Sequence, residues 1–265
     1  MRLTKHHGLG NDFLVLLDLD GTYDVSPSDA VALCQRHTGV GADGLLHVTA
    51  GTAQADVTMR LLNADGSVGE MSGNGIRCLA QAVLQAGVVE GPVVRVATGA
   101  GLRTVTVVEQ VDERTQRLSV EMGQAKVGEE LPGWESPQIR RAVRVDLGNP
   151  HLVLLWAGDE LPPRDELVEL GARFDSATPG GTNVEIIRSV ADGGIDMVVY
   201  ERGVGPTLAC GTGACASAAA AHAWDLAGHA ATVHMPGGSV EVVLDDPVLL
   251  VGDAASVAAI EVPWP

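Results

Sequence analysis

The chain has 265 residues, with 17 lysines and arginines against 34 aspartates and glutamates, and a formal net charge of −17 at pH 7. This acidity argues against a nucleic-acid-binding protein, which needs basic side chains to neutralise phosphates, and against binding to an anionic membrane surface. Hydrophobic residues make up 46% of the sequence, which is enough for a folded core and argues against global disorder. The length allows one large domain or two domains of roughly 100–150 residues.

In the first half of the chain, strand and helix patterns follow one another in a definite order. Apolar runs with alternation indicate strands, and apolar residues spaced by three and four positions indicate helices. A glycine-rich turn at residues 72–75 precedes an alanine-containing helix, and valine-rich strands follow it. The predicted elements are a strand at 13–18, a helix at 28–36, a strand at 56–62, a helix at 75–85 and strands at 93–96, 102–108 and 117–121.

The second half repeats this order of elements. A Gly-Asn turn again opens an apolar strand, and a glycine-rich turn at residues 210–213 again precedes a helix rich in alanine. The predicted elements are a strand at 152–156, a helix at 164–173, a strand at 195–200, a helix at 213–224 and strands at 232–234, 239–244 and 248–252.

Three segments of the first half recur in the second at one constant spacing of 138 residues (149 − 11, 201 − 63 and 210 − 72). The matches are residues 10–17 with 148–155, Asn63 with Glu201, and Ser72-Gly73-Asn74-Gly75 with Cys210-Gly211-Thr212-Gly213. Three matches in order at one offset indicate a duplicated structural unit.

From these patterns we predict an α+β fold of two pseudo-symmetric domains, each a mostly antiparallel or mixed sheet wrapped around a central helix. The helix at 213–223 contains no charged residue, and a helix that is apolar nearly all round is usually buried. The first domain is predicted at 1–125 and the second at 140–255, separated by a polar segment rich in Gly and Pro. A C-terminal strand within 256–265 is expected to complete the first domain.

No targeting or membrane segment is expected in this chain. Lys5, His6 and His7 precede the first apolar run, so residues 1–10 lack the apolar core of a signal peptide. No apolar run approaches the ~20 residues that a membrane span needs. We therefore expect a cytoplasmic protein without a metal site, because no zinc-binding spacing occurs among its reduced cysteines, Cys34, Cys78, Cys210 and Cys215.

The two glycine-rich turns suggest carbon-acid chemistry. Cys210 comes directly before a helix, where the positive end of the peptide dipoles lowers a thiol pKa. Glycines in such a turn leave backbone N–H groups free to bind a carboxylate. Together with the matching turn at Ser72, this predicts two groups that act on one substrate carbon. One would remove the α-proton, and the other would return a proton to the opposite face.

Several short motifs, taken together, resemble diaminopimelate epimerase. They are 7–13 (HGLGNDF), 63–67 (NADGS), 73–78 (GNGIRC), 148–151 (GNPH), 183–185 (NVE), 200–203 (YERG) and 210–213 (CGTG). The resemblance runs in order from about residue 1 to residue 250. It implies epimerisation of LL-2,6-diaminopimelate to the meso form, without pyridoxal phosphate or metal, for lysine and peptidoglycan synthesis. It also implies a helix inside each of two sheets, and it is compatible with a homodimer.

The resemblance further implies roles for individual residues. Cys210 and Ser72 occupy the two acid/base positions, and His151 and Glu201 assist them. The reacting α-carboxylate would be held by Gly73, Asn74, Gly211 and Thr212. The remaining polar groups of the substrate, including the distal carboxylate, would be recognised by Asn11, Asn63, Asn149, Asn183, Glu201 and Arg202. An asparagine suits such a substrate because it both donates and accepts, and an arginine can bind a carboxylate with two hydrogen bonds.

Two positions depart from the family pattern. Ser72 stands where the family has cysteine, and a serine hydroxyl holds no useful anion population at neutral pH unless a neighbouring base acts for it. Ser72 is open to three interpretations: an engineered substitution, a natural variant with a helper such as Glu201, or the mark of a related activity. Gly44 stands where some relatives carry a polar side chain, and we interpret it as a lost contact. Cys78 is expected to be a buried apolar residue rather than a replacement thiol.

Two other functions stay open at this point. The first is a racemase, epimerase or dehydratase for another amino acid such as a hydroxyproline, although Asn63, Asn183 and Arg202 favour a substrate with a charged distal end. The second is a catalytically impaired homologue that only binds its ligand. A phosphate-binding loop is the weakest interpretation, because no Gly-Lys-Ser/Thr follows the glycines.

Overall fold

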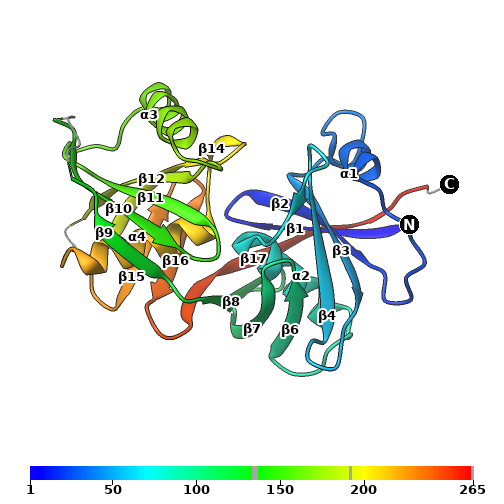
Figure 1. The fold of residues 1–265 in the computed structure, drawn as a ribbon. Coiled ribbons are helices and arrows are strands. Elements are labelled where there is room, and N and C mark those ends of the chain that lie inside the picture. The colour runs from blue at the N-terminus through cyan, green and yellow to red at the C-terminus, as the bar shows by residue number, and fades with distance from the viewer. Residues whose placement is uncertain (133–136, 191–192, 264–265) are drawn as a thin grey trace. The chain divides into compact units, whose positions relative to one another are not determined.

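The computed structural model describes residues 1–132, 137–190 and 193–263, and these form two compact units (Figure 1). Unit 1 contains Met1–Glu121 together with the C-terminal segment from Val251, and unit 2 contains Met122–Leu250. Residues 133–136 of the predicted separating segment and the last two residues of the predicted C-terminal strand lie outside the described part. Within that part, no helix has the length and hydropathy of a membrane span.

Unit 1 is a mixed, mostly antiparallel sheet with two helices. Its elements are β1 (Arg2–Gly8), β2 (Asn11–Leu17), α1 (Pro27–Cys34), β3 (Gly44–Ala50), β4 (Val57–Asn63), β5 (Val68–Gly69), α2 (Gly73–Gln85), β6 (Val93–Thr98), β7 (Gly101–Gln110), β8 (Thr115–Gly123) and the second part of β17 (Val248–Glu261). Strand β2 pairs in parallel with β3, and β4 in parallel with β6. Strand β17 pairs antiparallel with β1, with Leu3 opposite Ile260, so the end of the chain completes this sheet.

Unit 2 repeats the same order and the same pairings. Its elements are β9 (Lys126–Glu130), β10 (Ile139–Asp146), β11 (Pro150–Trp156), α3 (Arg164–Ala177), β12 (Asn183–Ser189), β13 (Ile195–Glu201), β14 (Gly205–Thr207), α4 (Gly211–Ala223), β15 (Ala230–Met235) and β16 (Gly238–Val243). Strand β11 pairs in parallel with β12, and β13 in parallel with β15, as their counterparts do in unit 1. The predicted α+β duplication is therefore confirmed.

One helix of each unit is buried inside its sheet. Helix α2 contacts β1, β2, β3 and β7, and helix α4 contacts β9 to β13, β15 and β16. Every residue from Gly73 to Val83 is buried, and α4 is buried at ten of its 13 positions because small alanines let the surrounding strands approach closely. Helix α3 instead packs against β12, β13 and β14, and its Leu167 and Phe174 share an apolar cluster with β10 to β12.

The strand registers refine the repeat that the sequence indicates. Phe13 lies opposite Gly44 on β3, and His151 lies opposite Asn183 on β12. The offset is thus 138 residues between β2 and β11 but 139 between β3 and β12. By this register Asn183 matches Gly44, and Glu185 matches Leu46. Strands β3 and β12 were not predicted; each adds a partner to the strand expected at 56–62 or 195–200.

Candidate active site

The two predicted acid/base residues occupy equivalent positions as the N-caps of the buried helices. Ser72 caps α2, and its Oγ accepts a hydrogen bond from the N–H of Gly75 at 3.1 Å. Cys210 caps α4, and its Sγ accepts from the N–H of Gly213 at 3.3 Å. The φ and ψ angles agree closely, at −134° and 125° for Ser72 and −132° and 115° for Cys210. Each N-cap therefore stands at a helix end where N–H groups favour an anion.

The glycines after each cap are required by close packing. A Cβ on Gly75 would lie 3.2 Å from the Ser72 Cβ and 3.4 Å from both Phe13 and Leu46. A Cβ on Gly213 would lie 2.6 Å from Oε1 of Glu185, which is closer than real Cβ contacts occur. Gly213 thus allows a carboxylate to approach the first turn of α4.

A matched pair of polar side chains lies beside each cap. In unit 1, Nδ2 of Asn74 donates to Oδ1 of Asn11 at 3.3 Å. In unit 2, Nδ2 of Asn149 donates to Oγ1 of Thr212 at 3.4 Å. The structure therefore brings together Asn11, Asn74 and the Ser72 turn in one unit, and Asn149, Thr212 and the Cys210 turn in the other.

Charged residues that the sequence interpretation did not include fix the orientation of the unit 1 amides. Arg77 is fully buried, and its Nη2 donates to Oδ1 of Asn74 at 2.7 Å. Nδ2 of Asn11 donates to Oδ2 of Asp43 at 2.9 Å. Because arginine only donates and a carboxylate only accepts, the direction of each hydrogen bond from Arg77 through Asn74 and Asn11 to Asp43 is set.

Asp12 anchors this network in the strand that carries Asn11. Its carboxylate lies 2.8 Å from Nζ of Lys5 and 2.7 Å from Nη2 of Arg36, which also contacts Asp43 at 2.7 Å. Burial raises the pKa of Asp12, but hydrogen bonds from Arg36 and Lys5 outweigh burial and hold the pKa at about 2. Asp12 is therefore ionised at every physiological pH.

The other predicted unit 1 residues have simpler surroundings. Asn63 ends β4, lies opposite Gly44 and donates from Nδ2 to Oγ of Ser67 at 2.9 Å. A Cβ on Gly44 would lie 3.0 Å from the Leu62 carbonyl oxygen and 3.3 Å from the Phe13 ring. The crowding explains why glycine suits this position. Among the described residues, the side chain of Ser72 makes one hydrogen bond, which it accepts from the N–H of Gly75.

In unit 2, Glu201 lies next to Cys210. It ends β13 and accepts a hydrogen bond from the Thr207 hydroxyl. Burial raises the pKa of Glu201 above its ordinary value, and the Thr207 hydrogen bond opposes that rise. Burial, followed by the charges of Glu201 and Glu185, raises the pKa of Cys210 well above its ordinary value.

The expectation that the helix end lowers the pKa of Cys210 is therefore wrong for this fold. The N–H of Gly213 does stabilise the thiolate, but desolvation and two nearby carboxylates are stronger. Cys210 is a neutral thiol at pH 7, and it can act as a base only if a neighbouring group takes its proton.

His151 is enclosed beside the same turn. Its Nδ1 lies 2.8 Å from Oε1 of Glu185, and its Nε2 lies 3.1 Å from Oδ1 of Asn149. The sequence interpretation gave Glu185 no role of its own. The available signal is a carboxylate in the middle of an apolar strand, between Val184 and Ile186, where a charge is costly to bury.

The two remaining predicted residues differ in exposure. Asn183 is buried, and its side chain bonds to the backbone, donating to the Pro150 carbonyl at 3.2 Å and accepting from the Arg202 N–H at 3.0 Å. Arg202 is exposed, and its Nη1 donates to the Gly180 carbonyl at 3.4 Å. Asn183 thus holds the backbone that carries Arg202, whose guanidinium faces solvent.

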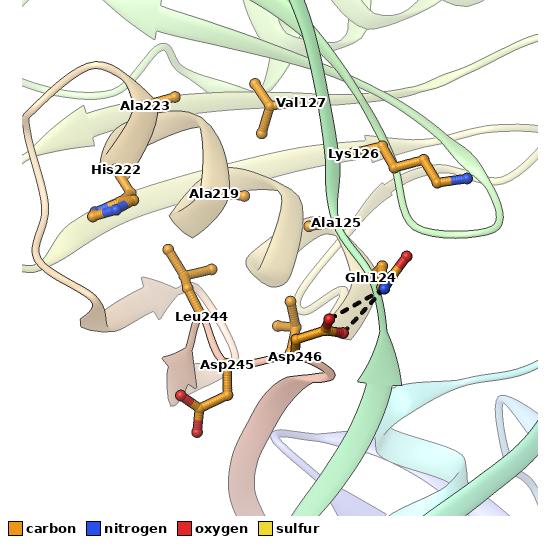
Figure 2. A pocket seen from close by; sticks show the side chains of 11 residues that line it. Gln124, Ala125, Lys126, Val127, Ala219, His222, Ala223, Leu244, Asp245 and Asp246 are labelled. Atoms are coloured by element: carbon orange, nitrogen blue, oxygen red, sulfur yellow. Dashed lines mark hydrogen bonds between the residues drawn. The ribbon is translucent and has the colours of Figure 1, made fainter.

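Two pockets of unit 2 lie near opposite ends of α4. One, of about 430 Å³, is lined by Asn149 and His151 together with Lys126 and Arg144, and so adjoins the Cys210 end. The other, of about 370 Å³, lies at the C-terminal end around Ala219, His222 and Ala223, where Gln124 bonds Asp246 (Figure 2). The 13 residues of α4 separate the two ends by roughly 20 Å. None of the predicted site residues lines the second pocket.

The other cysteines, Cys34, Cys78 and Cys215, are also buried. Burial raises the pKa of Cys78 to about 12 and that of Cys34 to about 11. Cys78 is fully buried, as a small apolar residue would be. In the ranges that the structure describes, no group of three or more His, Cys, Asp or Glu side chains is placed to hold a metal ion.

Comparison with solved structures defines the class of fold. A probable proline racemase from Agrobacterium radiobacter aligns with a TM-score of 0.72 at 19% identity, covering 100% of this chain and 93% of that one. A hydroxyproline epimerase from Agrobacterium vitis aligns with a TM-score of 0.71 at 18% identity, covering 98% and 91%. A phenazine biosynthesis protein from Bacillus anthracis has a TM-score of 0.72 at 14% identity, covering 100% and 99%. The chain therefore has the duplicated fold of these proteins.

Sequence comparison is more specific. A family model of diaminopimelate epimerase matches residues 3–128 and 143–254. Diaminopimelate epimerase of a Cyanothece species is 38% identical over 284 aligned positions, covering 97% of this chain and 98% of the relative. The enzyme of that name from Corynebacterium glutamicum is 37% identical, covering 97% and 96%. The chain belongs to the diaminopimelate epimerase family, which is a family of isomerases.

Proposed function

We propose that this protein is a cytoplasmic enzyme that epimerises LL-2,6-diaminopimelate to the meso form by proton transfer at the α-carbon, without pyridoxal phosphate. The observation that carries the proposal is the pair of buried helices with matched N-caps, Ser72 and Cys210, in a chain of this family. Each cap stands where backbone N–H groups can stabilise a carboxylate and the negative charge that forms on it.

The proton transfer on the Cys210 side follows from the local electrostatics. The thiol is neutral, and Glu201 is the neighbouring carboxylate that can accept its proton. The thiolate then takes the α-hydrogen as a proton, and the electrons of the broken C–H bond move into the substrate carboxylate. Return of a proton to the carbon from Cys210 restores the original configuration, so this side alone supports exchange with solvent.

Inversion requires a second group on the other face of the α-carbon, and we assign this role to Ser72. Its hydroxyl holds its proton far more tightly than a thiol does. In unit 1, the position that matches Glu201 is Asn63, which cannot accept a proton. We therefore expect the Ser72 step to limit inversion, while exchange through Cys210 is faster.

Cationic side chains near the site support a substrate that carries carboxylate groups, in spite of the net charge of −17. Arg202 is exposed at the end of β13, and Lys126 and Arg144 line the pocket beside Asn149. A guanidinium can hold the distal carboxylate with two hydrogen bonds. We assign this contact to Arg202, and we assign to Asn63 and Asn149 the recognition of the remaining polar groups.

The test follows deuterium and configuration in one incubation. With the wild-type chain in deuterated water, LL-diaminopimelate should gain α-deuterium. Its conversion to the meso form should be slower than this deuterium exchange. The Cys210→Ala variant should lose both by roughly 10²–10⁴-fold, the usual contribution of a general acid or base. Full activity in that variant would overturn the two-base proposal.

The same incubation separates the other functions. Binding of diaminopimelate without any α-deuterium would identify an impaired homologue that only binds. Deuterium exchange of hydroxyproline, but not of diaminopimelate, would identify an epimerase for a different amino acid.

A further inference from the structure

The side chain of Arg202 packs on the short segment of unit 2 that joins α3 to β12. The Arg202 backbone N–H donates to Oδ1 of Asn183 at 3.0 Å, and its Nη1 donates to the Gly180 carbonyl at 3.4 Å. A Cβ on Gly181 would lie 2.8 Å from both Cγ and Cδ of Arg202, which is closer than real Cβ contacts occur. The aliphatic stem of Arg202 therefore fills space that only a glycine leaves open.

The chain reversal after α3 explains one left-handed glycine, but this segment has two. The N–H of Gly181 donates to the Thr178 carbonyl at 2.8 Å, which closes a turn over the two residues between them. Gly180, with a φ of +80°, is the third residue of this turn, where a type II turn needs a positive φ. Gly181 comes after it and also has a positive φ, of +77°, a conformation that favours glycine. The second glycine therefore needs a reason other than the turn.

Unit 1 has neither the glycine nor the arginine at the matching positions. Counted from the strand registers, Gly181 matches Ala42, and Arg202 matches Ala64. Ala42 does not have a positive φ angle. The left-handed glycine thus occurs in the unit that carries the arginine and is replaced in the unit that does not. This supports Arg202 as the reason for Gly181.

Hydrogen bonds fix the segment that carries Gly181 to the end of α3. Oδ1 of Asp175 accepts from the Thr182 N–H at 2.8 Å, and the Thr178 hydroxyl donates to the Phe174 carbonyl at 2.9 Å. Helix α3 in turn packs against β12, β13 and β14. The surface under the Arg202 stem is therefore a fixed part of unit 2.

The other end of the site is fixed to the same stretch of backbone. Arg202 directly follows Glu201, whose carboxylate lies next to Cys210. Arg202 is exposed, so its guanidinium is open to a ligand. With the backbone held, the direction of the Arg202 stem decides how far the guanidinium lies from the Cys210 turn.

We propose that Gly181 is a positioning residue that determines substrate specificity through Arg202. By holding the stem of Arg202, it fixes the distance from the Cys210 turn at which a carboxylate can be bound. A ligand with two carboxylates is then selected by the length of the chain between them. This inference rests on the proposed function for the assignment of the distal carboxylate to Arg202. The packing of Arg202 on Gly181 does not depend on any substrate.

The experiment compares five chains: the wild type, Gly181→Ala, Arg202→Ala, the double variant Gly181→Ala/Arg202→Ala, and the control Gly193→Ala. Gly193 lies between β12 and β13, has a φ of +82°, and has no atom within 4 Å of an added Cβ. Alanine strains the backbone at both glycines, so we expect similar losses of thermal stability. Only at Gly181 does it displace Arg202.

The kinetic measurement is the KM and kcat for LL-diaminopimelate. Arg202→Ala should raise KM by roughly 10²-fold, the effect of losing hydrogen bonds between charged groups. Gly181→Ala should raise KM by about tenfold with little change in kcat, because it removes binding that substrate and transition state share. Its preference for diaminopimelate over the analogue with one more methylene should also fall. Gly193→Ala should keep the wild-type KM.

The double variant separates Arg202 from the other neighbour of Gly181. Oδ1 of Asp175 would lie 2.6 Å from the added Cβ, so Gly181→Ala disturbs that carboxylate as well. If Gly181 acts through Arg202, the double variant should have the KM of Arg202→Ala alone, since the two effects are then not additive. A KM that rises by a further tenfold in the double variant would overturn the inference.

A second measurement needs no substrate. Nitrogen relaxation of the arginine Nε–H groups reports how freely each guanidinium moves, and the signal that is lost in Arg202→Ala identifies Arg202. This group should be more mobile in Gly181→Ala than in the wild type and Gly193→Ala. Equal mobility in all three would also overturn the inference. If the mobility changes as expected but no chain turns over diaminopimelate, the proposed function falls and the packing of Arg202 on Gly181 stands.

Discussion

The two units share one backbone plan but place their charges differently. Unit 1 concentrates charge behind Asn11, where Asp12 and Asp43 meet Lys5 and Arg36. In unit 2 the residue matching Asp12 is Pro150.

Unit 2 concentrates charge under its helix instead. His151 and Glu185 lie there, with Glu201 close to the cap. The two units therefore carry a capped glycine-rich turn at the same place in the fold, with different charged side chains around it.

The largest expected effect comes from equalising the two caps. Ser72→Cys places a thiol on the α2 cap and should raise conversion to the meso form by roughly 10²-fold, since a thiol gives up its proton far more readily than a hydroxyl does. The rate of α-deuterium exchange should change much less, because the proposed proton transfer through Cys210 already supports exchange. The ratio of the exchange rate to the inversion rate, measured in deuterated water, tests this prediction and should fall in Ser72→Cys. An unchanged ratio would contradict the assignment of Ser72 to inversion.

A smaller effect is expected from the hydroxyl that supports Glu201. Thr207→Val removes a hydrogen bond that lowers the pKa of Glu201, so this pKa should rise further. Because Glu201 must be ionised to take the Cys210 proton, the rising limb of the pH–rate profile should move to higher pH, by about one unit.

The matched control is Ser67→Ala, which removes the Oγ that accepts from Asn63 at the equivalent end of β4. The rising limb of its pH–rate profile should lie at the same pH as in the wild type. Equal shifts in the two variants would mean that Glu201 is not the proton acceptor.

A third effect concerns stability and belongs to unit 1 alone. The folded pKa of Asp12 is about 2, below the unfolded value of 3.8. Asp12 therefore contributes stability that is fully present above pH 4 and is lost as the pH falls toward 2. Asp12→Asn should lower the free energy of unfolding by about 2 kcal/mol at pH 7 and by much less near pH 2.

Urea unfolding at both pH values tests this, with hydrogen exchange to locate the change. Amide protection should fall around β1 and β2 rather than in unit 2. A loss of the same size at both pH values would show that packing, and not the ionised carboxylate, is responsible.

Much of the fold could be predicted because it depends on local patterns. The helices beginning at Gly73 and Gly211 follow from glycine-rich turns before apolar, alanine-containing segments, and the order of elements follows from the repeat. Strands β3 and β12 were missed, since Gly44–Ala50 and Asn183–Ser189 are buried almost throughout and lack a polar alternation. The one-residue change of offset before them is also invisible without the strand registers.

The candidate site could be predicted less completely. Ser72, Asn11, Cys210 and Asn149 stand out because the repeat pairs them. The structure places Ser72 and Cys210 at matching helix ends, and Asn11 and Asn149 beside those ends. Asp43, Arg77 and Glu185 do not stand out, because their importance lies in what they contact across strands that are distant in sequence. The direction of the Cys210 pKa shift was predicted wrongly, since a helix end is visible in sequence but burial and neighbouring carboxylates are not.

The sequence by itself determined the duplication, the two capped helices and the imbalance between Ser72 and Cys210, because each is written in short runs of neighbouring residues. Only the tertiary structure decided which charges lie beneath each helix. That outcome depends on strand pairing, which brings Glu185 to His151 and Leu46 to Phe13. It also depends on desolvation, which keeps Cys210 protonated where the helix dipole alone would favour its thiolate.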